Sequence, residues 1–156
     1  MSPGVIPAMV VALLVGYLSY EVYRKGFVGS MFGARILRTV GEVVVEPERP
    51  GWFSRKVVCR VHCLDARGPG VPSIGIEVRE SFPMGSTISP VALTAERARA
   101  LVEAFSHSPE AALEEAASLI SRHLDWRPPT EGPLRLTSAE GHQLATLLAT
   151  ATAEVQ

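Results

Sequence analysis

The sequence predicts a single N-terminal transmembrane helix followed by a small α+β domain, in which an antiparallel sheet of about four strands carries helices packed on one face. Three observations predict this fold class. An uncharged apolar run lies near the start of the chain, segments with a two-residue period follow it, and segments with a helical period come last. Strands in one block and helices in another are typical of α+β folds.

Composition and charge limit the classes of protein to which this chain can belong. A chain of 156 residues with 47% apolar and 20% charged residues fits one folded domain with an appendage. A net charge of −1 argues against a chain built throughout for nucleic acid. Residues 24–60 hold eight basic and three acidic side chains, whereas residues 61–156 hold seven basic and twelve acidic ones. The basic part therefore lies next to the apolar run.

The apolar run predicts a transmembrane anchor over residues 1–23. Residues 5–20 are sixteen residues without a charge, and a bilayer core requires about 20. Glu21 can extend its carboxylate toward the interface, so that Val22 and Tyr23 lengthen the run. Two alternatives remain. A cleaved signal peptide lacks the basic residue that should precede the run, and a buried core helix is the other possibility for a short apolar segment.

Tyrosines and basic residues at the end of this run predict a membrane interface. A tyrosine ring prefers the level of the lipid headgroups, and basic side chains prefer the cytoplasmic side. The predicted location is the cell membrane, crossed once, with the N-terminus outside and the C-terminal domain in the cytoplasm. Anionic lipid is an expected partner. The membrane-interface residues are Tyr17, Tyr20, Tyr23, Arg24, Lys25, Arg35 and Arg38.

Two further parts of the N-terminal region are assigned to protein contacts. Gly16 and Ser19 are small residues at which helices of other membrane subunits can pack closely. Residues 24–38 form a basic neck that contains glycines. This neck is either a flexible connection or an apolar strip, with Phe27 and Phe32, that lies against a neighbouring subunit or the lipid interface.

The cytoplasmic α+β domain is predicted over residues 39–156. Four segments favour strands: 39–48, 55–66, 73–81 and 86–93, the last with a proline that favours a sheet edge. Three helices follow. Thr94 is the expected N-cap of the first, Ser108 with Pro109 begins the second, and Thr137 with Glu140 fits a capping box for the third.

Four strands followed by a helix, with IEVRE at 76–80 and VALT at 91–94, resemble in shape the single-stranded-DNA-binding domain of the PC4 transcriptional coactivator family. The resemblance covers about residues 40–106 and implies a sheet that binds single-stranded DNA. This sequence departs from the family because its strands hold few lysines and no aromatic ladder. Phosphate contacts and base stacking require such residues, so nucleic acid is an unlikely partner.

Residues with chemical potential do not form a known catalytic motif. The strand period places Cys59 and Cys63 on one face, as inward core residues, and His62 on the other, which argues against a metal site. Glu77, Arg79 and Glu80 project toward the polar face of a strand, where they form either an interaction rim or a solvated face, and the solvated face is favoured. We predict no catalytic residue, no metal ligand and no small-molecule substrate; the sequence does not identify a cofactor.

The leading hypothesis is a non-catalytic accessory subunit of a larger membrane protein complex. Trp52 and Phe53 either dock on the membrane or on a partner, or they belong to a loop that folds over the sheet edge. One alternative is a membrane-tethered module that binds a soluble regulator or nucleic acid through the polar face of the sheet around Arg60, His62, Glu77 and Arg79. The other is an enzyme with an unrecognised site. The predicted partner-docking residues are Phe27, Phe32, Trp52, Phe53, Arg60 and Arg79.

Overall fold

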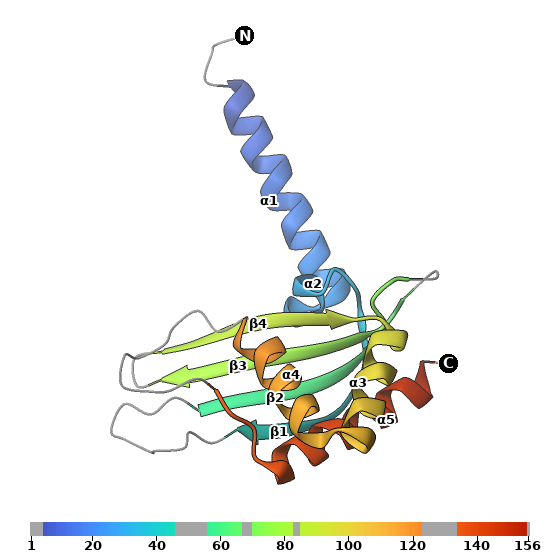
Figure 1. Ribbon diagram of the computed structural model, residues 1–156. Coiled ribbons are helices and arrows are strands. Elements are labelled where there is room, and N and C mark those ends of the chain that lie inside the picture. The colour runs from blue at the N-terminus through green and yellow to red at the C-terminus, as the bar shows by residue number, and fades with distance from the viewer. Residues whose placement is uncertain (1–4, 46–55, 67–69, 83–84, 123–133, 156) are drawn as a thin grey trace.

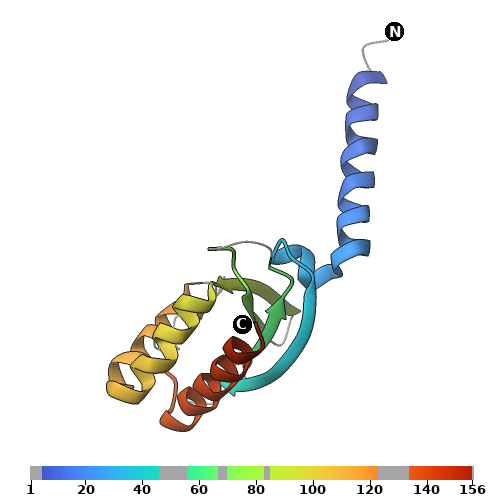
Figure 2. The ribbon, with the colours of Figure 1, turned by 90° about the vertical axis from the view of Figure 1, so that its right-hand side faces the viewer.

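The computed structural model describes residues 5–45, 56–66, 70–82, 85–122 and 134–155. A four-stranded sheet carries three helices on one face, and the N-terminal helix projects away from the domain (Figures 1 and 2). The elements in chain order are α1 (Val5–Lys25), α2 (Phe27–Met31), β1 (Ile36–Val45), β2 (Lys56–Leu64), β3 (Ile74–Phe82), β4 (Gly85–Leu93), α3 (Ala95–His107), α4 (Pro109–Ser121) and α5 (Ser138–Glu154).

The sheet is antiparallel, with the strand order β1-β2-β3-β4. Its inner face is built by alternate residues, because successive side chains of a strand point to opposite sides. Val61 on β2 pairs with Ile76 on β3, which pairs with Val91 on β4, and all three are buried. The α+β prediction, with about four antiparallel strands and helices on one face, is therefore confirmed for the domain.

The helices begin where the sequence predicts. The Thr94 side chain accepts a hydrogen bond from the Arg97 amide at 3.2 Å. Thr137 and Glu140 form the expected capping box, in which the Thr137 amide donates to Glu140 Oε2 at 2.6 Å. Pro109 opens α4, where a missing amide proton costs little. Local signals were sufficient here because each cap involves residues close in sequence.

Helix α5 closes the edge of the sheet at β1. Its Gln143 side chain donates to the backbone oxygen of Glu42 at 3.2 Å. Leu147 lies over Gly41, where an added Cβ would meet Leu147 Cδ2 at 2.7 Å. At the other edge, β4 contains Pro90, which has no amide proton to offer to another strand. Both edges are thus protected against pairing with another chain.

The predicted transmembrane anchor is wrong. Within the described residues, no helix combines the length and the apolarity needed to cross a membrane. The sixteen uncharged residues before Glu21 rise about 24 Å at about 1.5 Å per residue, which is less than the hydrocarbon thickness of about 30 Å. The predicted single-pass location, with the N-terminus outside and the domain in the cytoplasm, depended on this anchor and is corrected with it.

Replacement of Leu148 tests the packing of α5. Leu148 is 0% exposed, so Leu148→Ala should lower the free energy of unfolding by about 2–5 kcal/mol through lost burial and a residual cavity. Urea denaturation followed by circular dichroism measures this change. The control is Leu37→Ala, at a side chain 61% exposed, which should cost less than about 0.5 kcal/mol. Equal losses in the two variants would contradict the described core.

Candidate functional site

The sheet face opposite the helices carries a cluster of charged and polar side chains, which we call the open-face cluster. The register of the ladder brings its members together. His62 lies opposite Thr39 on β1, and Arg60 lies between Glu42 on β1 and Glu77 on β3. Arg60 and His62 on β2 share one face with Glu77 and Arg79 on β3, because the members of each pair are two residues apart along their strand. On β1, the irregularity between Thr39 and Gly41 brings Thr39 and Glu42, which are three residues apart, onto this same face. The members are Thr39, Glu42, Arg60, His62, Glu77 and Arg79.

His62 is the centre of the open-face cluster. The residue is 3% exposed. Its Nδ1 lies 2.9 Å from Thr39 Oγ1, and its Nε2 lies 3.2 Å from Glu77 Oε2. Both ring nitrogens are therefore within hydrogen-bonding distance of a side-chain oxygen, one from each neighbouring strand.

Glu77 is a buried carboxylate, only 2% exposed. Arg79 donates to its Oε1 at 3.2 Å, and Arg60 approaches the same oxygen at 3.9 Å. Arg60 also donates through Nε to Glu42 Oε2 at 2.9 Å. A carboxylate removed from water requires such partners, because desolvation otherwise opposes its charge. The two arginines and His62 surround the Glu77 carboxylate, and the arginines balance its negative charge.

The protonation state of His62 follows from these contacts. Burial lowers its pKa below the ordinary value of 6.5, against the opposing effect of the hydrogen bond to Glu77. The ring is therefore neutral at pH 7. An ionised carboxylate accepts only, so Nε2 carries the proton and donates to Glu77, and Nδ1 accepts the proton of the Thr39 hydroxyl. The hydrogen bonds thus run in one direction, from hydroxyl to imidazole to carboxylate.

Phe32 covers one end of the open-face cluster. Its ring contacts His62 edge-on, with the ring centroids 6.0 Å apart. Gly75, opposite His62 on β3, leaves room for this ring, since an added Cβ would meet Phe32 Cε1 at 2.8 Å. Phe32 follows directly after α2, so it connects the cluster to the base of α1.

Helix α1 is the second candidate surface. The large apolar side chains described on it are between 40% and 70% exposed. They point to all sides of the helix except the one on which Ala12, Gly16 and Ser19 lie. The helix lies far from the core and projects beyond the sheet (Figures 1 and 2). These residues are Val10, Val11, Leu13, Leu14, Val15, Tyr17, Leu18, Tyr20 and Val22.

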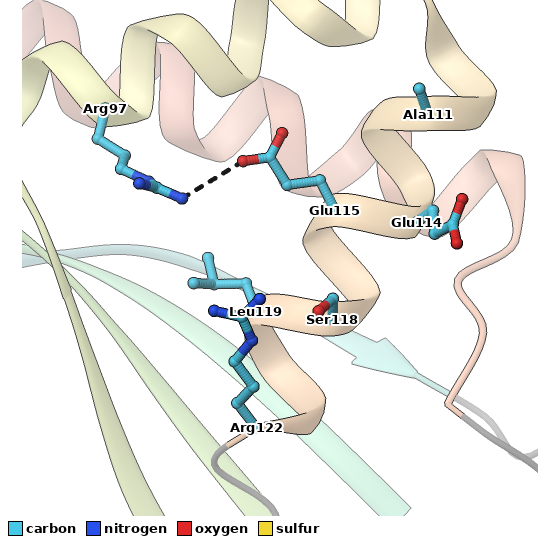
Figure 3. Close-up of a pocket in the computed structure, with 7 residues that line it drawn as sticks. All are labelled: Arg97, Ala111, Glu114, Glu115, Ser118, Leu119 and Arg122. Atoms are coloured by element: carbon cyan, nitrogen blue, oxygen red, sulfur yellow. Dashed lines mark hydrogen bonds and ion pairs between the residues drawn. The ribbon is translucent and has the colours of Figure 1, made fainter.

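A cavity of about 370 Å³ lies between α3 and α4 (Figure 3). Arg97 and Arg122 line it together with Glu114 and Glu115. The ion pair from Arg97 to Glu115 spans 3.5 Å between side chains that are 63% and 54% exposed, and such exposed pairs bind weakly. Opposite charges in equal number give this cavity no preference for an anion or a cation.

The predicted site residues are dispersed over the structure. Gly16, Tyr17, Ser19 and Tyr20 are exposed on α1. The side chains of Tyr23, Arg24 and Lys25, and all of Trp52 and Phe53, lie outside the described residues. The roles at the membrane interface lose the anchor on which they were based, and the contact with anionic lipid stays a prediction.

The remaining predicted residues lie in the neck and on the sheet. Arg35 is exposed, and Arg38 forms an ion pair of 2.7 Å with Glu154 of α5. Phe27 is 64% exposed at the start of α2. Of the predicted docking residues, the structure brings Phe32, Arg60 and Arg79 together around His62 and Glu77.

The two cysteines are buried in the core, as predicted. Burial raises the pKa of Cys59 to about 12, and burial followed by a hydrogen bond to Glu154 raises the pKa of Cys63. Both thiols stay protonated at neutral pH, which makes them poor nucleophiles. Among the described residues, no group of three or more histidine, cysteine or acidic side chains could hold a metal ion.

The sequence predicted part of the open-face cluster, since Arg60, His62, Glu77 and Arg79 were assigned to the polar face of the sheet. The solvated interpretation was wrong for Glu77, which three basic or imidazole side chains enclose, and for Glu80, which is 1% exposed. Thr39 was not recognised at all. The strand period predicted that Arg60 and His62 share a face, but only the strand register places Thr39 opposite His62.

No protein-family model matches this chain, and neither a curated protein nor a solved structure matches it. The resemblance to the PC4 family therefore still rests on the two short strings and the order of elements.

The lowered pKa of His62 predicts a pH-dependent stability. Between the folded pKa and the unfolded value near 6.5, the unfolded chain binds more protons, so the free energy of unfolding should fall as the pH is lowered through this interval. Urea denaturation at about pH 7.5 and about pH 5.5 measures the slope, which His62→Asn should reduce. The control His107→Asn, at an exposed position on α3, should keep it. An unchanged slope in His62→Asn would contradict the assignment.

Proposed function

We propose that this protein is a subunit of a larger protein complex, in which α1 is buried among apolar helices of a partner. The observation that carries the proposal is the exposure of large apolar side chains over most of the circumference of α1, a helix that projects away from the domain (Figures 1 and 2). Leu13 is 70% exposed and Tyr17 is 63% exposed. Such a helix requires neighbours on several sides to remove it from water.

The exposed area supports a macromolecular partner. The nine large apolar side chains of α1 together expose on the order of 900 Å², which exceeds the roughly 300–600 Å² of the largest patch on a typical monomer. Burial of this area at about 25 cal/mol per Å² offers a large gross driving force for association. A single neighbouring helix would cover only one side, so the proposal is a partner that supplies several apolar helices.

The domain would hold α1 at a defined place on the partner. The α2 helix and Phe32 link α1 to the open-face cluster, where the ring of Phe32 packs against His62 and Gly75. The apolar exposure continues at Phe27. In this arrangement, the sheet and its three helices act as a rigid body that is carried beside the partner.

Binding of nucleic acid receives no such support from the sheet. Arg60 and Arg79 on the open face are already engaged by Glu42 and Glu77. These carboxylates neutralise the arginines and would repel phosphate groups. A test with labelled single-stranded DNA at low salt should therefore show no salt-sensitive binding.

Photo-crosslinking tests the proposed partner. A photoreactive amino acid at Leu14, which is 59% exposed on α1, should form discrete crosslinked products in cells. The same group at the exposed Glu96 of α3 serves as the control. Mass spectrometry of purified products identifies the partner. Products with apolar helical segments from Leu14 alone support the proposal, and the absence of any product specific to Leu14 contradicts it.

Gly16→Leu tests whether helix packing on α1 drives the association. An added side chain at Gly16 meets nothing within 4 Å, so the free energy of unfolding of the domain should not change. A bulky residue at a close helix contact should weaken association by about tenfold or more. The control is Ala92→Leu, on an exposed position of β4. Copurified partner is quantified for both; equal recovery would show that Gly16 does not face the partner.

A further inference from the structure

Three side chains of the open-face cluster form a relay. Thr39, His62 and Glu77 come from β1, β2 and β3, and the contacts between them measure 2.9 Å and 3.2 Å. A hydroxyl held by an imidazole, which is itself oriented by a carboxylate, is the general arrangement of an activated oxygen nucleophile. The direction of the hydrogen bonds agrees with this role, because His62 Nδ1 is free of a proton and faces the hydroxyl of Thr39.

The relay presents only its hydroxyl to the surroundings. Thr39 is exposed, whereas His62 and Glu77 are 3% and 2% exposed. Glu77 cannot rotate away easily, because Arg79 and Arg60 hold its second oxygen. The imidazole is therefore fixed in the orientation in which it can accept the proton of Thr39.

We propose that Thr39 is an acyl-acceptor site, at which Oγ1 takes the acyl group of a thioester or a comparably activated ester. This activity goes beyond the proposed function and does not depend on it. Oγ1 attacks the carbonyl carbon as its proton passes to His62 Nδ1, and a C–O bond forms. The C–S bond then breaks, and the leaving thiolate takes the proton from His62. The products are an ester of Thr39 and a free thiol.

The burial of His62 favours a thioester as the acyl donor. A thiolate leaves without prior protonation far more readily than an alkoxide or an amine, so it does not require an acid beside the leaving group. A water molecule that is to hydrolyse the new ester would have to reach the same buried imidazole. The acyl group should therefore remain on Thr39, and the reaction should stop after one equivalent.

Acetylation by a small thioester tests the proposal. The full chain is incubated with the acetyl thioester of N-acetylcysteamine and analysed by intact mass spectrometry and peptide mapping. One acetyl group on Thr39 is expected. Thr39→Ala should lose this adduct and Thr39→Ser should keep it, while Thr150→Ala, at an exposed threonine of α5, should react as the wild type does.

The role of His62 is tested by rate and by pH. His62→Asn should slow acetylation of Thr39 by about 10²-fold or more, as expected for loss of a general base, and His107→Asn should not. The wild-type rate should reach its plateau near pH 7, whereas a lysine acceptor would react faster up to about pH 10. If His62→Asn does not fold, its circular dichroism signal will be lost. In that case, two measurements still test whether Thr39 accepts the acyl group: the comparison of Thr39→Ala with Thr39→Ser, and the pH profile of the wild type.

Several results would overturn the proposal. Two of them concern the position of the adduct: an acetyl group on a lysine in place of Thr39, or an unchanged adduct in Thr39→Ala. The other two are an unchanged rate in a folded His62→Asn and the absence of any adduct. None of these results bears on the partner of α1, which the crosslinking experiment addresses separately.

Discussion

The carboxylate of Glu77 is the constraint on which the open face of the sheet depends. It is 2% exposed, although it lies on the sheet face opposite α3, α4 and α5 (Figures 1 and 2). Because desolvation disfavours an isolated charge, the surrounding side chains must supply donors. Arg79 and His62 do so from the same and the neighbouring strand, and Arg60 adds its charge from a greater distance. One buried charge thus determines the orientation of three other side chains.

This cluster joins the two parts of the molecule. Phe32 rests on His62 and on Gly75, where the missing side chain leaves space for the ring. The same residue follows α2 and so determines where the chain leaves the sheet toward α1. The cluster and α1 differ in chemistry, but the chain connects them directly.

The opposite face of the sheet is apolar and packs against the helices. Alternate residues such as Val61 and Ile76 meet apolar side chains of the helices, among them Leu148. The helices also protect the sheet, since Gln143 of α5 binds a carbonyl at the edge of β1. The inner face therefore supplies the stability of the domain, and the outer face is left for polar interactions and for the contact with Phe32.

Much of the fold was predictable because its determinants are local. The two-residue period of β2 and the caps at Thr94 and Thr137 each involve residues within a few positions of one another, so the sequence alone determined the strands, the helix starts and the α+β class. The role of the apolar N-terminal run could not be decided from its composition, because its length of uncharged residues was close to the limit for a membrane span. The strand register brought Thr39, His62 and Glu77 together, and only the tertiary structure decided it. Register depends on how whole strands pair and pack, and no short stretch of sequence carries that information.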